Sequence, residues 1–473
     1  MTHHFRRRDA LQSIGAATAA LILPASGARA AGREFTPEMF GAVGDGRSDD
    51  HAAFVRLAAA VTQAGGGTVR FGRRKRYRLD QVHVGGPRRN NLPIIGFTRC
   101  SGLTVDFNES TVDVKGDFHR SADVREGRQS FLRSVDPLVF TDCSNLIVRN
   151  GVMNGNADRM TRDRTVVESS GRGIMLSGCT QVLLEDLHIH HFPTDGVSVG
   201  QNAERRVSRN VRLSRVRLTN NARLGLFIQG ASGVTATDCV FSENGYTGGT
   251  YYHRPGAGVD LEPNWEMDLR SDLRALRCRF DNNRGSPLVA GNPDKEAFVE
   301  LIDCSGTAPS HRRLILTAER SLIRGGSWHN VQISCAYLAR RRFRSGISIE
   351  VTGGIWSGDD PGWNPVYDLN WHRPEVRIHS NRFELRSPQP YEANALFQCA
   401  NVNHRFENNN IFVAAGGHGG AGDRLVGRFT GALVGGNQWS TDLRPPRRFV
   451  NNYSGARGVS GERFSGSFAG VSL

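Results

Sequence analysis

The chain has 473 residues, with 60 Lys or Arg and 46 Asp or Glu, and its formal net charge at pH 7 is +14. Lys75, Lys115 and Lys295 are the only lysines, so this charge comes from arginine. A basic excess favours a polyanionic partner, and because no nucleic-acid-binding motif accompanies it, we expect an acidic polysaccharide and no nucleic acid.

The first 30 residues are typical of an export signal. Arg6, Arg7 and Arg8 precede an apolar run over residues 14–23, and small residues around Ala30 suit a cleavage site. The Arg pair followed by Leu-Gln favours a twin-arginine signal, with Ala10 where Phe is usual, and an ordinary secretory signal is the alternative. We therefore expect an exported protein, periplasmic or extracellular. No later run is long and apolar enough to span a membrane.

Residues 31–72 are expected to form an N-terminal strand and a capping helix. The segment Gly-Ala-Val-Gly-Asp-Gly at residues 41–46 leads to Asp49 and Asp50, either of which can N-cap a helix over residues 51–64. The apolar residues Phe54, Leu57, Ala58 and Val61 then share one helix face. Such a helix suits the cover that the first open coil of a solenoid requires.

A short pattern recurs from the cap to the C-terminus: apolar, any, apolar, two polar residues, a small residue or Cys, any, apolar. Clear copies occupy residues 146–153, 182–189, 234–241 and 273–280, and the spacing settles near 28 residues in the second half. A repeated short period indicates a solenoid, and the alternation of apolar positions indicates strands. We therefore expect residues 73–473 to form an all-β, single-stranded parallel β-helix domain.

The cap segment, its helix and the following Gly-Gly-Gly-Thr-Val at residues 65–69 resemble the N-terminal signature of the pectate-lyase superfamily, in its rhamnogalacturonase/epimerase-type branch. The resemblance implies a right-handed β-helix over roughly residues 35–470, and it implies that the cap aspartates are structural. Polysaccharide lyases, hydrolases and phage tailspikes share this branch, so the resemblance leaves the reaction open. Because tailspikes are trimers, monomer and homotrimer both stay open.

Eight cysteines in an exported chain raise the possibility of disulfides. Cys100, Cys143 and Cys179 occupy one column of the repeat, and a second column is formed by Cys239, Cys278 and Cys304. Cysteine in such columns behaves as a small apolar core residue, so we expect buried free thiols.

A second ladder of strands precedes the repeat copies and carries the candidate catalytic residues. In the rung Gly258-Val259-Asp260-Leu261-Glu262, period-two alternation turns Asp260 and Glu262 outward, about 7 Å apart. Asp195 precedes the rung that starts at Gly196, and we expect it to face the same shallow groove. Carboxyl groups 6.5–9.5 Å apart suit inverting glycoside hydrolysis, so these three acids are the candidate acid/base set.

Residues that could bind a sugar lie close to these acids in the sequence. The long connection before Gly258 holds Tyr251, Tyr252, His253 and Arg254, and long loops on a rigid scaffold commonly carry binding residues. Tyr rings can stack on sugars, and Arg can pair with a uronate carboxylate. We add three further candidates to the binding set: His191, Gln229 and Trp265.

Alternatives to hydrolysis stay open. Thr194-Asp195-Gly196 resembles the Asn-Thr-Asp-Gly element of polygalacturonases, but Pro193 replaces the Asn and the Asp-Asp pair that follows in that family is absent. A calcium-assisted lyase would use Asp260 and Glu262 as metal ligands, whereas hydrolysis requires no cofactor. A glycan-binding or structural β-helix without catalysis is the third hypothesis.

Overall fold

The computed structural model describes residues 32–80, 95–115, 124–126, 129–131, 136–159, 166–168, 171–249, 252–262, 271–290, 297–335, 348–368, 375–389, 395–399, 403–417, 423–444 and 448–471. The chain forms two compact units. The N-terminal unit comprises Met1–Val234 and Asn244–Gly256, and the C-terminal unit comprises Thr235–Glu243 and Ala257–Leu473. The expected export signal lies outside the described residues, and the expected boundaries at residues 30 and 72 stay predictions.

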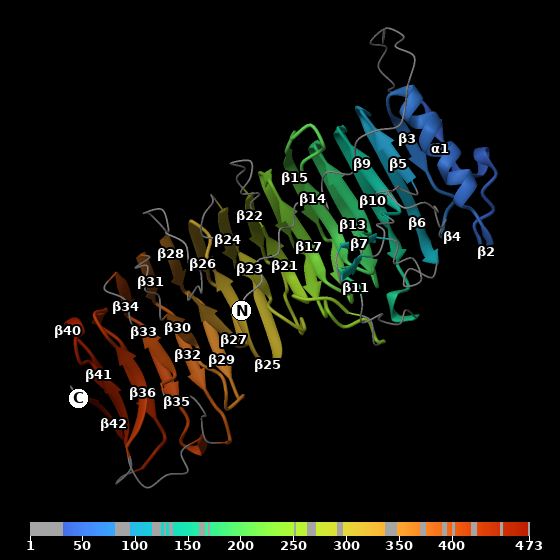
Figure 1. Cartoon of the computed structure of the whole chain (residues 1–473). Helices are drawn as coiled ribbons and strands as arrows, with labels where there is room; N and C mark the ends of the chain where they lie inside the picture. The colour runs from blue at the N-terminus through green and yellow to red at the C-terminus, as the bar shows by residue number, and fades with distance from the viewer. Residues whose placement is uncertain are drawn as a thin grey trace. The chain divides into compact units, whose positions relative to one another are not determined.

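Each unit is built from β-strand coils with parallel pairing between successive turns, as the repeat predicts (Figure 1). One coil passes through three strand segments, which we name faces A, B and C in chain order. The repeat copies form faces A and B, and the second ladder forms face C. The expected parallel β-helix is confirmed in both units.

In the N-terminal unit, faces A and B share three long strands that bend between them: β6 (Leu103–Lys115), β10 (Ser144–Asn154) and β13 (Thr180–His190). Face A also holds β1 (Glu34–Phe35), β3 (Gly67–Arg70), β15 (Ser208–Ser214) and β18 (Ala231–Ser232), and face B holds β2 (Asp45–Asp49), β4 (Arg76–Asp80) and β16 (Arg217–Thr219). Face C holds β5 (Ile95–Thr98), β9 (Leu138–Thr141), β12 (Ile174–Ser177), β14 (Asp195–Gly200) and β17 (Leu224–Gln229). A small separate sheet comprises β7 (Val124–Glu126), β8 (Gln129–Phe131) and β11 (Val166–Glu168), and a 3₁₀ turn, η3, spans Ala157–Arg159.

In the C-terminal unit, face A holds β22 (Ser271–Leu276), β24 (Ala297–Ile302), β26 (Arg320–Arg324), β28 (Ser348–Thr352), β31 (Glu375–His379), β34 (His404–Glu407), β37 (Leu433–Gly435) and β40 (Arg457–Ser460). Face B holds β20 (Val240–Ser242), β29 (Ile355–Gly358), β32 (Arg382–Leu385), β35 (Asn410–Val413), β38 (Gln438–Thr441) and β41 (Arg463–Phe464). Face C holds β21 (Ala257–Leu261), β23 (Leu288–Ala290), β30 (Val366–Asp368), β33 (Phe397–Cys399), β36 (Arg424–Phe429), β39 (Phe449–Asn452) and β42 (Phe468–Val471). The long strands β25 (Ser305–Leu316) and β27 (Ser327–Ser334) run from face B into face C, β19 (Val234–Thr237) joins the units, and η4 spans Ala415–Gly417.

The bend between faces A and B has a local cause. Residues with a positive φ occupy this bend, as at Asn108, Asn150 and Asp186, where φ is 51°, 61° and 52°. Asn and Asp tolerate this left-handed conformation better than most residues. The polar pair in the repeat therefore marks the corner of the coil.

The N-terminal cap matches the sequence prediction. The 3₁₀ turn η1 (Pro37–Phe40) precedes α1 (His51–Ala64), whose apolar face, including Phe54, Leu57 and Val61, is buried. Asp50 occupies the N-cap position but makes no side-chain capping bond to the helix. Its carboxylate instead accepts hydrogen bonds from the Val43 and Gly44 amides at 2.6 and 3.3 Å, so this acid is structural.

Face C of the N-terminal unit has the predicted register. Ile174 pairs with Val197 and Leu176 pairs with Val199, and all four side chains are buried in the core. Met175, Ser198 and Phe227 form the expected outward column, yet each is at most 9% exposed. This part of the outer face is therefore largely shielded from solvent.

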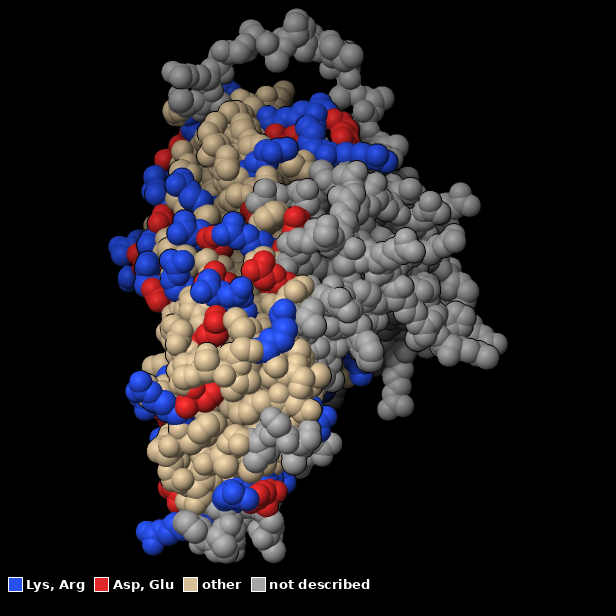
Figure 2. All heavy atoms as spheres, turned by 90° about the vertical axis from the view of Figure 1, so that its left-hand side faces the viewer, with Lys and Arg blue, Asp and Glu red and all other residues tan. Residues whose placement is uncertain are grey.

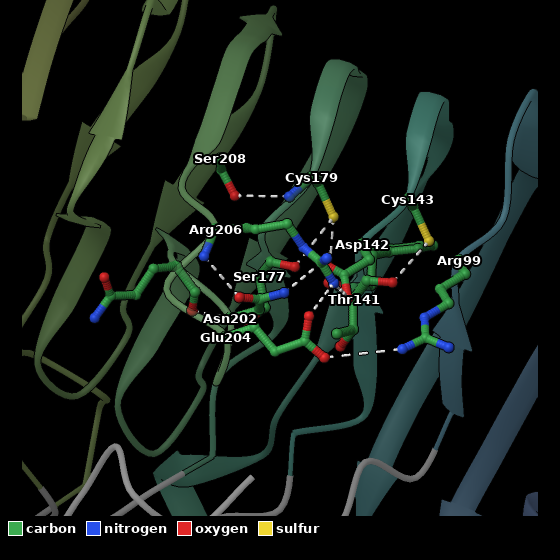
Figure 3. Close-up of polar contacts among 12 residues, drawn as sticks. Arg99, Thr141, Asp142, Cys143, Ser177, Cys179, Asn202, Glu204, Arg206 and Ser208 are labelled. Carbon is green, nitrogen blue, oxygen red and sulfur yellow. Dashed lines mark hydrogen bonds and ion pairs between the residues drawn. The ribbon is translucent and has the colours of Figure 1, made fainter. Parts of the chain in front are cut away.

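The two cysteine columns are confirmed, because all eight cysteines are free and buried. In the N-terminal unit, the thiols of Cys143 and Cys179 donate to the carbonyls of Phe97 and Phe140 on preceding coils. Figure 3 shows both thiols beside the polar contacts that hold the turn after β14, where Arg206 donates to Asp142 at 2.7 and 3.1 Å. The cysteines therefore stabilise the coils by packing and by weak thiol hydrogen bonds, and not as disulfides.

The second column continues along the C-terminal unit with other residue types. It starts with Cys239, Cys278 and Cys304, and an added Cβ at Gly326 would collide with the carbonyl oxygen of Cys304. Further along, Asn381, Asn409 and Asn437 form a ladder in which each side chain accepts from the previous residue's amide, and Glu462 ends it by accepting from Asn437. One interior corner is therefore polar but internally hydrogen-bonded.

Among the described residues, no helix has the length and apolar character that crossing a membrane requires.

Candidate functional site

Asp195 occupies a different environment from the open groove that we expected. It pairs with Leu224 in the register of face C, which is a core-facing position, and its side chain is 0% exposed. Arg223 donates from Nε and Nη2 to the two carboxylate oxygens at 2.8 and 2.7 Å, and Ser198 Oγ donates at 3.1 Å. A carboxylate bound in this way is suited to fixing guanidinium groups and has little room for a catalytic water.

A second ion pair extends this buried cluster. Arg172 donates from its backbone N to Asp136 at 2.8 Å and from Nη1 at 3.2 Å, and its Nε lies 3.8 Å from Asp195. Asp136 is 1% exposed. Two guanidinium groups therefore face two buried carboxylates, which balances the charge that burial would otherwise make costly.

His191 belongs to a cluster of three imidazoles on face B of the N-terminal unit. His190 Nδ1 lies 2.6 Å from His191 Nδ1, the His188 and His190 rings are 4.4 Å apart, and His188 Nε2 lies 2.9 Å from Thr219 Oγ1. Burial, with repulsion from Arg217 and His191, lowers the pKa of His188 to about 4. Burial and the two neighbouring imidazoles lower the pKa of His190 to about 3. Both rings are therefore neutral near pH 7.

The other predicted binding residues of this unit occupy varied positions. His253 is 3% exposed and its backbone N donates to Ala222 O at 2.8 Å, whereas Arg254 is exposed. Gln229 and Tyr252 are partly exposed. Tyr251 lies outside the described residues. A binding role for these residues stays a prediction.

Asp260 and Glu262 lie in the C-terminal unit. Asp260 pairs with Val289 on face C and is 4% exposed, while Glu262 follows the strand and is partly exposed. Asp195 belongs to the other unit, so the expected convergence of the three acids stays a prediction. Trp265 lies outside the described residues.

Face C of the C-terminal unit carries an outward row of side chains in register with Asp260, which we name the face C row. It runs through Val289, Ile315, Ser334, Tyr367, Gln398 and Arg428. Arg313 and Gln332 pair with each other two residues before Ile315 and Ser334, so they share the same side of the sheet. Sequence reasoning missed these residues, although the alternation in Gln332-Ile333-Ser334 is a signal that could have identified them.

Two features of the face C row and the adjacent Arg313 suit a sugar acid. The Arg313 guanidinium lies 5.6 Å from the centre of the Tyr367 ring, and Arg428 is exposed. Across the part of the chain that the structure describes, neither Arg313 nor Arg428 makes an ion pair. Arg side chains bind carboxylates in bidentate fashion, and aromatic rings stack on apolar sugar faces.

Several other exposed arginines pair with acidic residues. Figure 2 shows a face on which Lys or Arg and Asp or Glu residues lie interspersed. Examples from the C-terminal unit are Arg279 with Asp281 at 2.6 Å and Arg386 with Glu384 at 3.0 Å. No three His, Cys, Asp or Glu side chains converge as metal ligands among the described residues.

Comparisons with known proteins identify the fold. The family model for a right-handed β-helix region matches residues 130–265. The uncharacterized protein YclG of Bacillus subtilis is 28% identical over 133 residues, which are 26% of this chain and 22% of that protein. The match thus spans about a fifth of that relative's length.

Solved structures resemble the chain over most of its length at low identity. The N-terminal fragment of bacteriophage phi29 gene product 12 is 12% identical, with 91% of this chain and 72% of that chain covered and a TM-score of 0.53. The Streptococcus pneumoniae surface adhesin PfbA is 11% identical, with 90% and 91% covered and a TM-score of 0.50. The mannuronan C-5 epimerase AlgE6 A-module of Azotobacter vinelandii is 12% identical, with 93% and 96% covered and a TM-score of 0.45. The family model and the two structures with TM-scores of 0.53 and 0.50 support a right-handed β-helix fold for the chain.

Proposed function

We propose that the protein is an exported carbohydrate-active enzyme that hydrolyses an acidic, uronate-containing polysaccharide on face C of the C-terminal unit. The observation that carries the proposal is that Asp260 shares one outward row with Tyr367, Gln398 and Arg428. An extended glycan bound along the face C row would contact the carboxyl groups of Asp260 and Glu262 at one end. Further along the row it would contact the side chains of Tyr367, Gln398 and Arg428. The fold supplies the row but does not by itself indicate a reaction.

Asp260 and Glu262 are the proposed acid/base pair. Residues two apart on one side of a strand are separated by about 7 Å, which is within the range that leaves room for a water molecule between an inverting pair. Asp195 is left out of this pair, because two arginines and a serine bind its carboxylate. We assign it a structural role in the N-terminal unit.

Product analysis on uronate-containing glycans tests the proposal. We expect new reducing ends without the ultraviolet absorbance of an unsaturated sugar. The variants D260N and E262Q should each lower the rate by about 100-fold or more, in line with the loss of a positioned acid or base. The control E375Q removes an exposed carboxylate on face A and should keep the wild-type rate. Full activity in D260N and E262Q would refute their assignment as the acid/base pair. Ultraviolet absorbance of the product would show that the reaction is β-elimination and not hydrolysis.

A glycan-binding protein without catalysis is the second candidate. It is favoured by the ion pairing of Asp195, which removes one of the three acids from the expected acid/base set. Binding of acidic glycans without either product would support this candidate over the hydrolase.

A further inference from the structure

We infer that Arg313, Gln332 and Tyr367 form a subsite for one uronate residue in the C-terminal unit. The inference deepens the proposed function by naming the residues that would select an acidic sugar, but it requires binding only. All three residues lie on face C, on the successive strands β25, β27 and β30. The site is therefore built on paired strands, which position side chains more rigidly than loops do.

The buried amide of Gln332 is the first observation that points to a ligand. Gln332 is 4% exposed, and within the residues that the structure describes its Oε1 atom has no hydrogen-bond partner. A buried carbonyl oxygen without a donor costs free energy, so its presence on an outward-facing position requires an explanation. A sugar hydroxyl is a donor that would satisfy it.

The positive charge of Arg313, on the strand next to that of Gln332, is the second observation. Gln332 pairs with Arg313 on one side, and its strand pairs with the strand of Tyr367 on the other. The Arg313 guanidinium lies 5.6 Å from the centre of the Tyr367 ring and is exposed. Within the described residues it has no carboxylate partner. A uronate carboxylate is the planar anion that a guanidinium binds with two parallel hydrogen bonds.

Each part of a uronate then has a matching side chain. Arg313 would take the carboxylate, Gln332 Oε1 would accept from a ring hydroxyl, and Tyr367 would contact the apolar face of the sugar ring. Arg428 lies in the face C row on the fourth strand beyond that of Arg313 and two register positions further along, roughly 20 Å away at about 4.8 Å per strand and about 7 Å per two residues. A second carboxylate of the same chain could reach it, so the row favours an extended polyuronate over a single sugar acid.

Calorimetric titration with oligogalacturonate and oligomannuronate, and with their carboxyl-reduced forms, tests the inference. We expect R313A to weaken binding of at least one acidic oligosaccharide by about 10-fold or more and to leave binding of the reduced form unchanged. The matched control R405A removes an exposed arginine from face A of the same unit and should keep the wild-type affinity. Equal losses in R313A and R405A would overturn the inference, because a general charge effect would then explain the binding.

The variant Q332L separates a binding role from a structural one. Because Oε1 has no partner to lose among the described residues, we expect Q332L to keep the thermal stability of the wild type and to lose about 10-fold in affinity. Wild-type affinity in both R313A and Q332L would refute the subsite, while cleavage by the wild type would leave the proposed function intact. Binding that depends on both residues in a protein that releases no product would refute the proposed hydrolysis and support the subsite.

Discussion

The buried pair of Asp195 and Arg223 allows a sharp test of the structural role given to Asp195. The variant D195N keeps the shape of the side chain but removes the carboxylate charge that accepts two hydrogen bonds from the Arg223 guanidinium, whose side chain is 8% exposed. Breaking a buried ion pair from one side costs about 3–5 kcal/mol, because the other charge stays buried and uncompensated. R223M should cost somewhat less, because Arg172 stays 3.8 Å from Asp195.

The double variant D195N/R223M completes a double-mutant cycle. Removing both charges should cost at least about 2 kcal/mol less than the sum of the two single changes, because no unpaired charge remains. Urea unfolding monitored by circular dichroism measures the free energy of unfolding of each variant. The transitions are comparable if the slope of this free energy against urea concentration is the same in all variants. A coupling energy below about 0.5 kcal/mol, or a fully stable D195N that loses catalysis, would refute the structural role and restore Asp195 as a catalytic acid.

Three further predictions concern stability. Because the pKa values of His188 and His190, about 4 and about 3, lie below the ordinary 6.5, the unfolded chain takes up protons first as the pH falls. Stability should thus be full above about pH 6.5 and decline toward pH 4, and replacing both residues by Gln should flatten a plot of the urea midpoint against pH. In the ladder, N409A breaks four buried hydrogen bonds and should cost about 3 kcal/mol in urea unfolding, whereas the exposed neighbour change N410A should stay within about 0.5 kcal/mol. D50A should lower the melting temperature by several degrees, about 2 kcal/mol, because cap amides lose their acceptor, and an unchanged melting temperature would contradict the structural reading of that acid.

The fold could be predicted because one local rule repeats. Each coil alternates apolar and polar residues on its strands, and a residue that tolerates positive φ, such as Asn150 or Asp186, marks the corner. The same rule correctly predicted that the cysteines are buried free thiols. It required only residues that are close in the sequence.

The candidate site was predicted less well, because it depends on contacts between coils. Period-two alternation already places Asp195 on the same side of the strand as Val197, which is the core side. The expectation that Asp195 faces a groove did not take this alternation into account. The ion pair with Arg223 joins residues 28 positions apart, and no local pattern indicates it. Arg313 and Gln332 were missed because strands β25 and β27 run from one face into the next without the break that precedes other face C strands.

The most direct test of the account compares one acidic polysaccharide with its carboxyl-reduced form as substrates of the wild-type protein. Release of reducing ends from a panel of polyuronates, with each reduced counterpart beside it, measures both cleavage and the need for the carboxylate. We expect cleavage of at least one acidic form and little or none of its reduced counterpart. Equal cleavage of both forms would contradict recognition of the carboxylate, and neither cleavage nor binding of any acidic form would contradict the proposed function as a whole.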